Sequence, residues 1–157
     1  MRLYFFITMA KIRITKEFVF DMAHVLPQYD GKCRNIHGHT YKLQVTLIGV
    51  PCEDKSSSKC GMVLDFGDLK KAVQIPIVDR FDHAIVAPIG FNYGCLNMFQ
   101  EEGKFIEVPF QPTCENMTIN IAETIKKNLP KDVELYSVRL WETPTSFAEW
   151  NREDNEL

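Results

Sequence analysis

The chain has 157 residues, a mass of 18.2 kDa and a formal net charge of −3, with 45% hydrophobic and 25% charged residues. This length suits one globular domain, and the composition argues against a disordered or fibrous protein. The small negative charge argues against nucleic-acid binding, which normally requires a basic stripe on the surface. No apolar run approaches the roughly 18 residues of a membrane-spanning helix. We therefore expect one domain over residues 1–157, with neither a nucleic-acid nor a membrane partner.

The N-terminal segment and the cysteines bear on the cellular compartment. Residues 3–7 are apolar, but this run is shorter than the hydrophobic core of a signal peptide. Met9 offers an alternative start, so residues 1–8 are interpreted as an upstream-start extension or as the edge of the first strand. The five cysteines contain no Cys-x-x-Cys pair, which argues against a zinc ribbon or a thioredoxin motif. We expect free thiols and a cytoplasmic protein.

Two strands and a helix are predicted in the first half of the chain. Residues 11–20 are rich in β-branched and aromatic side chains, which is typical of a strand. Residues 40–50 alternate between apolar and polar side chains, as in a half-buried strand antiparallel to the first. Asp65 can cap a helix that begins at about Gly67, and Pro76 is expected to kink or end it.

A second helix and two further strands are predicted in the second half. Thr113 can cap a helix whose apolar residues follow the helical period until Pro130 stops it. Residues 133–142 and 146–150 are predicted to be strands, whereas residues 88–110 are interpreted as a loop. The order of two strands, two helices and two strands indicates an α+β fold rather than alternating β-α-β units.

Three of the four histidines point to a metal site. His37 and His39 are two residues apart on a predicted strand, so both imidazoles can face the same side. His24 ends the preceding strand and can supply a third imidazole. Three neutral imidazoles suit Zn²⁺ and leave a fourth position open, as in catalytic sites. The alternative is that His37 and His39 are surface histidines, and the spacing does not choose zinc over iron or nickel.

Three further positions carry groups that can transfer protons or bind a substrate. Cys33 precedes His37 by four residues, so it is a candidate thiolate, a fourth metal ligand or a small buried side chain. In Asp82-His83, the carboxylate can fix the tautomer of the imidazole. Glu142 ends a predicted strand, where the alternative to a functional carboxylate is an exposed turn residue.

The segments that contain these residues form a combined pattern. They are FDMAH at 20–24, CRNIHGHTYKL at 33–43, GMVLDFGDLK at 61–70, FDH at 81–83, PTCEN at 112–116 and WET at 141–143. Together they resemble the 6-pyruvoyltetrahydropterin synthase / 6-carboxytetrahydropterin synthase family, in the family's order and over nearly the whole chain from residue 16. Residues 88–110 depart from the family pattern and resemble a loop insertion.

The resemblance implies the tetrahydropterin, or tunnelling, fold. This fold has a four-stranded antiparallel sheet, with two helices between strands 2 and 3 packed on one face. Members of the family form trimers in which the sheets join into a barrel, and two trimers stack into a hexamer with active sites at subunit interfaces. Closing the barrel removes the exposed sheet edges. We therefore expect a homo-oligomer.

The spacing between Cys33 and His37 resembles that of the bacterial 6-carboxytetrahydropterin synthases of queuosine biosynthesis. The resemblance implies that the substrate is 7,8-dihydroneopterin triphosphate. The products would be 6-carboxy-5,6,7,8-tetrahydropterin, acetaldehyde and triphosphate, which makes the protein a carbon–carbon lyase. One alternative is a 6-pyruvoyltetrahydropterin synthase, or a dihydroneopterin-related lyase, of the same family. Another is a non-catalytic metal-binding module on the same fold.

The resemblance also assigns roles to individual residues. His24, His37 and His39 would hold Zn²⁺. Cys33 would act as the general base, and Asp82 with His83 would move protons on the other side of the substrate side chain. Glu142 would bind the amino group and the neighbouring N–H of the pterin ring. Thr113 and Glu115 match positions that line the pterin pocket, although both also suit the start of a helix.

Overall fold

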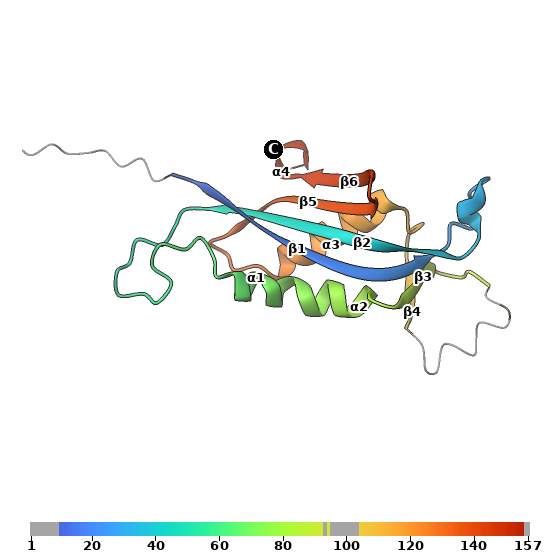
Figure 1. The fold of residues 1–157 in the computed structure, drawn as a ribbon, viewed down its shortest axis with the longest axis horizontal. Coiled ribbons are helices and arrows are strands. Elements are labelled where there is room, and N and C mark those ends of the chain that lie inside the picture. Colours follow the sequence, from blue (N-terminus) through green and yellow to red (C-terminus); the bar gives the residue numbers. More distant parts are fainter. Residues whose placement is uncertain (1–9, 93, 95–103, 156–157) are drawn as a thin grey trace, which may run out of the picture.

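The computed structural model describes residues 10–92, 94 and 104–155. Within these residues, six strands form one mixed sheet in the order β4-β3-β1-β2-β5-β6, and Figure 1 shows its long strands β1 and β2 above α1 and α2. The architecture is therefore α+β. Residues 1–8 lie outside the described residues, so their interpretation as an extension stays a prediction. None of the helices in the described part of the chain has the length and apolar character needed to cross a membrane.

The centre of the sheet is a long antiparallel pair, β1 (Ile12–His24) and β2 (His37–Gly49). Its register runs from Ile12 opposite Gly49 to His24 opposite His37. Both strands alternate between buried and exposed residues over most of their length, because one face packs on the core while the other stays open. β2 begins three residues before the predicted strand, so all of the His-Gly-His motif belongs to it.

A hairpin of β5 (Glu134–Thr143) and β6 (Ser146–Asn151) extends the sheet beside β2. Pro144 and Thr145 form the turn between the two strands. This confirms the two strands predicted at the end of the chain. The hairpin matters for the site because Glu142 lies near the end of β5, next to the turn.

Two short strands, β3 (Ala84–Pro88) and β4 (Phe105–Val108), were not predicted. β3 pairs parallel with β1, and β4 pairs parallel with β3. The expected four-stranded antiparallel sheet is therefore wrong in the number and in the direction of its strands. Both segments are too short to show a period, and β3 is mostly apolar, so the alternation that reveals a half-buried strand is missing. β4 also lies inside the stretch 88–110 interpreted as a loop, of which residues 93 and 95–103 lie outside the described residues.

The helices begin where the sequence predicted. Asp65 caps α1 (Phe66–Val73), with its Oδ1 accepting from the Gly67 amide at 2.7 Å. Pro76 does not end the helical path. It is accommodated in a π-helical turn, η2 (Gln74–Val78), whose wider ring tolerates the missing N–H, and the chain continues into α2 (Asp79–Phe81). Thr113 caps α3 (Cys114–Asn128). Two short elements complete the fold, η1 (Lys32–Arg34) and α4 (Arg152–Asn155).

The hydrophobic core lies between the sheet and the helices α1 to α3, which cover one of its faces (Figure 1). Strand residues such as Tyr41 and Leu43 meet helix residues such as Ile77 and Ile121 in one buried cluster. The opposite face of β1 and β2 carries mainly polar residues that are more exposed. The core reaches the end of the β1–β2 pair, where the buried His24 follows the last apolar side chains of β1.

Candidate metal and substrate site

Three histidines converge at the end of the β1–β2 pair. His24 lies directly opposite His37 in the register. His39 lies opposite Met22, only two residues along the strands from that pair, so the three histidines start from neighbouring backbone positions. Each imidazole offers one ligand nitrogen, and these nitrogens all lie within 4.8 Å of one another. His24 is 1% exposed. The predicted convergence of the three imidazoles is present in the structure.

Backbone carbonyls orient two of the rings. His24 Nδ1 lies 2.7 Å from Pro112 O, and His37 Nδ1 lies 2.8 Å from Asn35 O. A carbonyl oxygen only accepts hydrogen bonds, so each Nδ1 carries the proton and each Nε2 carries a lone pair. This is how metal-binding histidines are usually held in proteins.

The free lone pairs of the cluster favour a cation between them. His24 Nε2 and His37 Nε2 are 3.1 Å apart, and His39 Nε2 is buried without a hydrogen-bond partner among the described residues. Two lone pairs that face each other repel unless a proton or a metal ion lies between them. Burial also lowers the pKa of His24, despite the opposing effects of Pro112 and Glu142, which favours the neutral, ligating form of the ring. The donor set fits a divalent metal ion.

Glu142 borders the histidine cluster. Its Oε1 lies 3.6 Å from His24 Nε2 and 3.9 Å from His39 Nε2, and it accepts a hydrogen bond from the Tyr41 hydroxyl at 3.3 Å. Burial raises the pKa of Tyr41, as do the charges of Glu142 and Cys114, so the hydroxyl remains a donor. The alternation of residues 40–50 does not single out Tyr41 as a site residue. The missed signal is that a buried tyrosine hydroxyl needs a partner.

A cavity of about 620 Å³ opens beside these groups. Its lining includes His39 and Glu142 together with Lys42 and Trp141. Lys42 forms an ion pair with Glu17 at 2.9 Å and lies 5.1 Å from the centre of the Trp141 ring. Sequence reasoning did not single out Lys42, because an alternating polar residue on a strand is usually only solvated.

Asp82 and His83 form a second polar group at the turn between α2 and β3. His83 Nδ1 lies 2.9 Å from Asp82 Oδ2, so the neighbours in sequence do interact. Asp82 Oδ1 also accepts from the Asp21 amide at 3.0 Å. That backbone hydrogen bond, followed by the hydrogen bond with His83, holds the pKa of Asp82 below its usual range. The carboxylate therefore stays ionised and can orient the ring of His83.

The two groups lie on opposite faces of the sheet. The carboxylate of Asp21 lies close to Asp82 and His83. Asp21 alternates with the buried residues of β1, so its side chain is on the open face, where it accepts a hydrogen bond from the Thr40 hydroxyl at 2.5 Å. His24 and His39 belong to the helix-covered face. A cavity of about 420 Å³ at the strand ends borders both His39 and His83. Even so, the described residues of one chain do not bring His83 into the histidine cluster.

Cys33 lies in η1, is partly buried, and is close enough to Tyr41 to contribute to its raised pKa. The described residues contain two groups whose ligand atoms could hold a metal ion, the three histidines and Asp21 with Asp82 and His83, and Cys33 belongs to neither. Thr113 Oγ1 accepts from the Asn116 amide at 3.3 Å, as a helix cap does. Glu115 is exposed in the first turn of α3 and borders a separate cavity beside Phe147.

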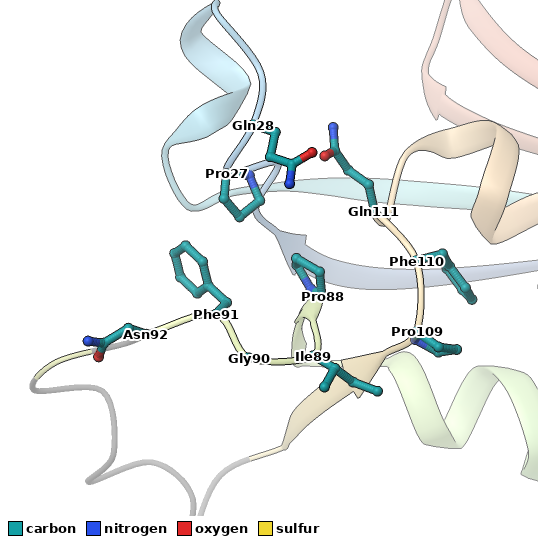
Figure 2. A pocket seen from close by; sticks show the side chains of 10 residues that line it. All are labelled: Pro27, Gln28, Pro88, Ile89, Gly90, Phe91, Asn92, Pro109, Phe110 and Gln111. Carbon is teal, nitrogen blue, oxygen red and sulfur yellow. The ribbon is translucent and has the colours of Figure 1, made fainter.

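A further cavity, of about 570 Å³, lies between the loops around residues 27–28, 88–92 and 109–111 (Figure 2). The amides of Gln28 and Gln111 point toward each other across its opening, with Phe91 on one side. The described residues that line it include no charged side chain and none of the predicted site residues. Its importance for the site is indirect, because Gln111 leads into Pro112, whose carbonyl orients His24.

Comparison with known proteins identifies the family. The model of the family described as "6-pyruvoyl tetrahydropterin synthase" matches residues 13–153. The chain therefore belongs to this family.

Individual curated relatives are similar to the chain in sequence, and solved structures are similar to it in fold. The chain is 43% identical to the 6-carboxy-5,6,7,8-tetrahydropterin synthase of Haemophilus influenzae, over 88% of this chain and 97% of the relative. It is 34% identical to the dihydroneopterin monophosphate aldolase of Pyrococcus furiosus, over 84% and 90%. Its fold resembles the 6-pyruvoyl tetrahydropterin synthase of Caenorhabditis elegans, with a TM-score of 0.65, 26% identity and coverage of 91% and 96%.

Proposed function

We propose that the protein converts 7,8-dihydroneopterin triphosphate to 6-carboxy-5,6,7,8-tetrahydropterin, acetaldehyde and triphosphate, in queuosine biosynthesis. The observation that carries the proposal is the convergence of three histidine Nε2 atoms beside Glu142 at the edge of a cavity. The 43% identity to a curated 6-carboxy-5,6,7,8-tetrahydropterin synthase supports the choice of this reaction within the family.

His24, His37 and His39 would hold a zinc ion. When bound, this ion supplies Lewis acidity toward the two adjacent hydroxyl groups of the substrate side chain. The protein contributes fixed ligand geometry, since the carbonyls of Pro112 and Asn35 hold two of the rings with Nε2 free.

The proton transfers are assigned to Cys33 and to the Asp82–His83 pair. Cys33 takes a proton from the carbinol of the substrate side chain as the general base. His83, oriented by the Asp82 carboxylate at 2.9 Å, moves protons on the other side of the side chain. The ionised Asp82 favours the Nδ1–H tautomer of His83, which leaves Nε2 available to accept a proton.

Glu142 binds the pterin ring. A carboxylate can accept from the 2-amino group and the neighbouring ring N–H at the same time, which is a strong, charge-assisted pair of hydrogen bonds. Tyr41 holds one oxygen of this carboxylate, and the cavity beside it offers the Trp141 ring as an apolar wall. Thr113 and Glu115 are proposed to complete the pterin pocket.

The active site is proposed to assemble between subunits of a hexamer built from two trimers. The argument is the separation of the polar groups within one chain. The histidine cluster belongs to the helix-covered face and the Asp82–His83 pair to the open face. A neighbouring subunit can supply the second group to the first.

The test is incubation of the purified protein with 7,8-dihydroneopterin triphosphate, followed by mass analysis of the products. Release of acetaldehyde together with the 6-carboxy product supports the proposal. A 6-pyruvoyl product without acetaldehyde would reassign the chain within its family. The same assay with dihydroneopterin monophosphate tests the second candidate, an aldolase, which the 34% identity to the Pyrococcus furiosus enzyme favours. A protein that binds metal but turns over neither substrate would be a non-catalytic module.

A further inference from the structure

Lys104 connects the strand β4 to the Asp82–His83 turn. It directly precedes β4, and its ammonium group donates to Asp79 O and to Asp82 O, both at 2.8 Å. Asp79 begins α2 and Asp82 follows its last residue, so Lys104 binds carbonyls at the end of a helical segment, where cations are favourable. Its own backbone is fixed as well, because Lys104 O accepts from the Ile85 amide at 2.8 Å.

The turn that Lys104 contacts has an unusual backbone. His83 has a φ of +60°, and it is the one described non-glycine residue with a positive φ. Such a conformation is unfavourable for a residue with a side chain and persists only where the surroundings enforce it. In the proposed reaction the direction of the His83 ring depends on this backbone together with the Asp82 carboxylate, because the side chain itself is 77% exposed.

One peptide group is held from both ends. The His83 amide donates to Asp21 O at 2.6 Å, and the Asp82 carbonyl, which belongs to the same peptide group, accepts from Lys104 Nζ. The bond to Asp21 ties the turn to β1, and the bond to Lys104 ties it to β4. Together they fix the plane of the peptide group that precedes the Cα of His83, which is one of the two sides of the φ rotation of His83.

We propose that Lys104 is a positioning residue that sets the direction of the Asp82–His83 pair. The proposal rests on the proposed function of that pair in proton transfer. The proposal also gives residues 88–110 a role. Lys104 lies within this segment, which resembles an insertion, and its side chain supports the turn that carries Asp82 and His83. An ammonium group suits this role because it can donate to two carbonyls at once and its charge strengthens both hydrogen bonds.

The test compares Lys104→Met, which keeps much of the length but removes the donors, with Lys104→Arg, which keeps charge and donors. Lys127→Met, on the exposed side of α3, is the matched control. We expect Lys104→Met to lower kcat by about 10- to 100-fold, as misplaced catalytic groups do, with KM and metal content unchanged. Lys104→Arg should restore part of kcat, and Lys127→Met should resemble the wild type.

Hydrogen exchange measured by mass spectrometry separates this proposal from the proposed function. A peptide that covers residues 79–85 should exchange faster in Lys104→Met, while peptides from β2 and α3 should not change. This readout needs no turnover, so it tests Lys104 even if the wild type proves inactive on the pterin substrate. Unchanged exchange of residues 79–85 in Lys104→Met would overturn the proposal, as would a loss of activity that only follows a loss of metal.

Discussion

At the scale of single residues, the histidine cluster gives a prediction about metal content. His37→Ala removes one of three converging Nε2 atoms, so the purified variant should lose most of its bound divalent metal together with its activity. The fold should survive, because His37 is only partly buried at a strand end. Elemental analysis of the purified protein measures the first effect and circular dichroism the second.

His83→Ala is the control for this experiment, because His83 belongs to the other polar group. It should reduce turnover while leaving the metal content at the wild-type level. Metal content that is equal in His37→Ala and in the wild type would contradict the three-histidine assignment.

Glu142 gives a prediction about ring recognition. Glu142→Gln keeps the size of the side chain but turns one acceptor into a donor, which faces a donor of the pterin. The loss of a charge-assisted hydrogen bond costs about 1.5–3 kcal/mol, or about 10- to 100-fold in affinity. A titration with biopterin measures this loss. Glu123→Gln, on the exposed side of α3, should leave the affinity unchanged. Equal affinities for all three proteins would remove Glu142 from the site.

Cys114 gives a prediction about pH dependence. Burial of its thiol, which donates to Leu140 O, raises the pKa of Cys114 to about 11. The thiolate is the reactive form, and at pH 8 only about one thiol in a thousand is ionised at such a pKa. Alkylation by iodoacetamide, followed by mass spectrometry, should therefore be slow at pH 8 and rise steadily up to about pH 11. The exposed Cys60 serves as the internal reference, and a Cys114 labelled as fast as Cys60 at pH 8 would contradict the prediction.

The convergence of the histidines was the part of the candidate site easiest to predict. Histidines on a strand at spacing two must share a face, so the convergence of His37 and His39 follows from the pattern alone. The partner of Glu142 could not be predicted in this way. Tyr41 shares a strand face with core residues such as Leu43, so its pattern indicates only packing, and the three-dimensional structure is needed to show that its hydroxyl reaches β5.

At the scale of elements, Thr113 gives a prediction about stability. Its hydroxyl accepts from the Asn116 amide at the start of α3, so Thr113→Ala should lower the free energy of unfolding by about 1 kcal/mol. Thr113→Ser should retain most of the wild-type stability, because serine also caps helices. If Thr113 also lines the pterin pocket, as proposed, Thr113→Ala weakens pterin binding as well.

Urea denaturation measures this change. Thr124→Ala is the comparison, since Thr124 bonds the Asn120 carbonyl inside the helix, where alanine is the better helix former. Thr124→Ala should therefore cost less than Thr113→Ala, and the reverse order would contradict a capping role.

The long elements were predictable and the short ones were not. β1, β2, β5 and α3 are long enough to show strand composition, alternation or the helical period, and α3 also has a cap residue and a proline at its ends. β3 and β4 have five and four residues, and their place in the sheet depends on parallel pairing of β3 with β1 and of β4 with β3, which no local pattern encodes. The consequence reaches the site, because β4 brings Lys104 to the turn that carries Asp82 and His83.

At the scale of the whole molecule, the two faces of the sheet separate groups that the proposed reaction needs together. The histidine cluster belongs to the helix-covered face, whereas Asp21 joins Asp82 and His83 to the open face. A cyclic assembly of identical chains can bring these groups together. Each interface of such a ring joins two different surfaces, so the histidine cluster of one chain can meet the Asp82–His83 pair of the next. A native mass of six times the 18.2 kDa chain would support the proposed hexamer.

Mixing two inactive variants tests whether the site is shared between subunits. Cys33→Ala lacks the base and His83→Ala lacks the second proton carrier, so each assembly alone should have little activity. Assemblies formed by refolding or coexpressing both chains contain interfaces at which an intact Cys33 meets an intact His83. With random mixing about one quarter of the sites in a cyclic assembly are of this kind, so roughly a quarter of wild-type turnover should return. If both residues act within one chain, every site lacks one of them and mixing restores nothing.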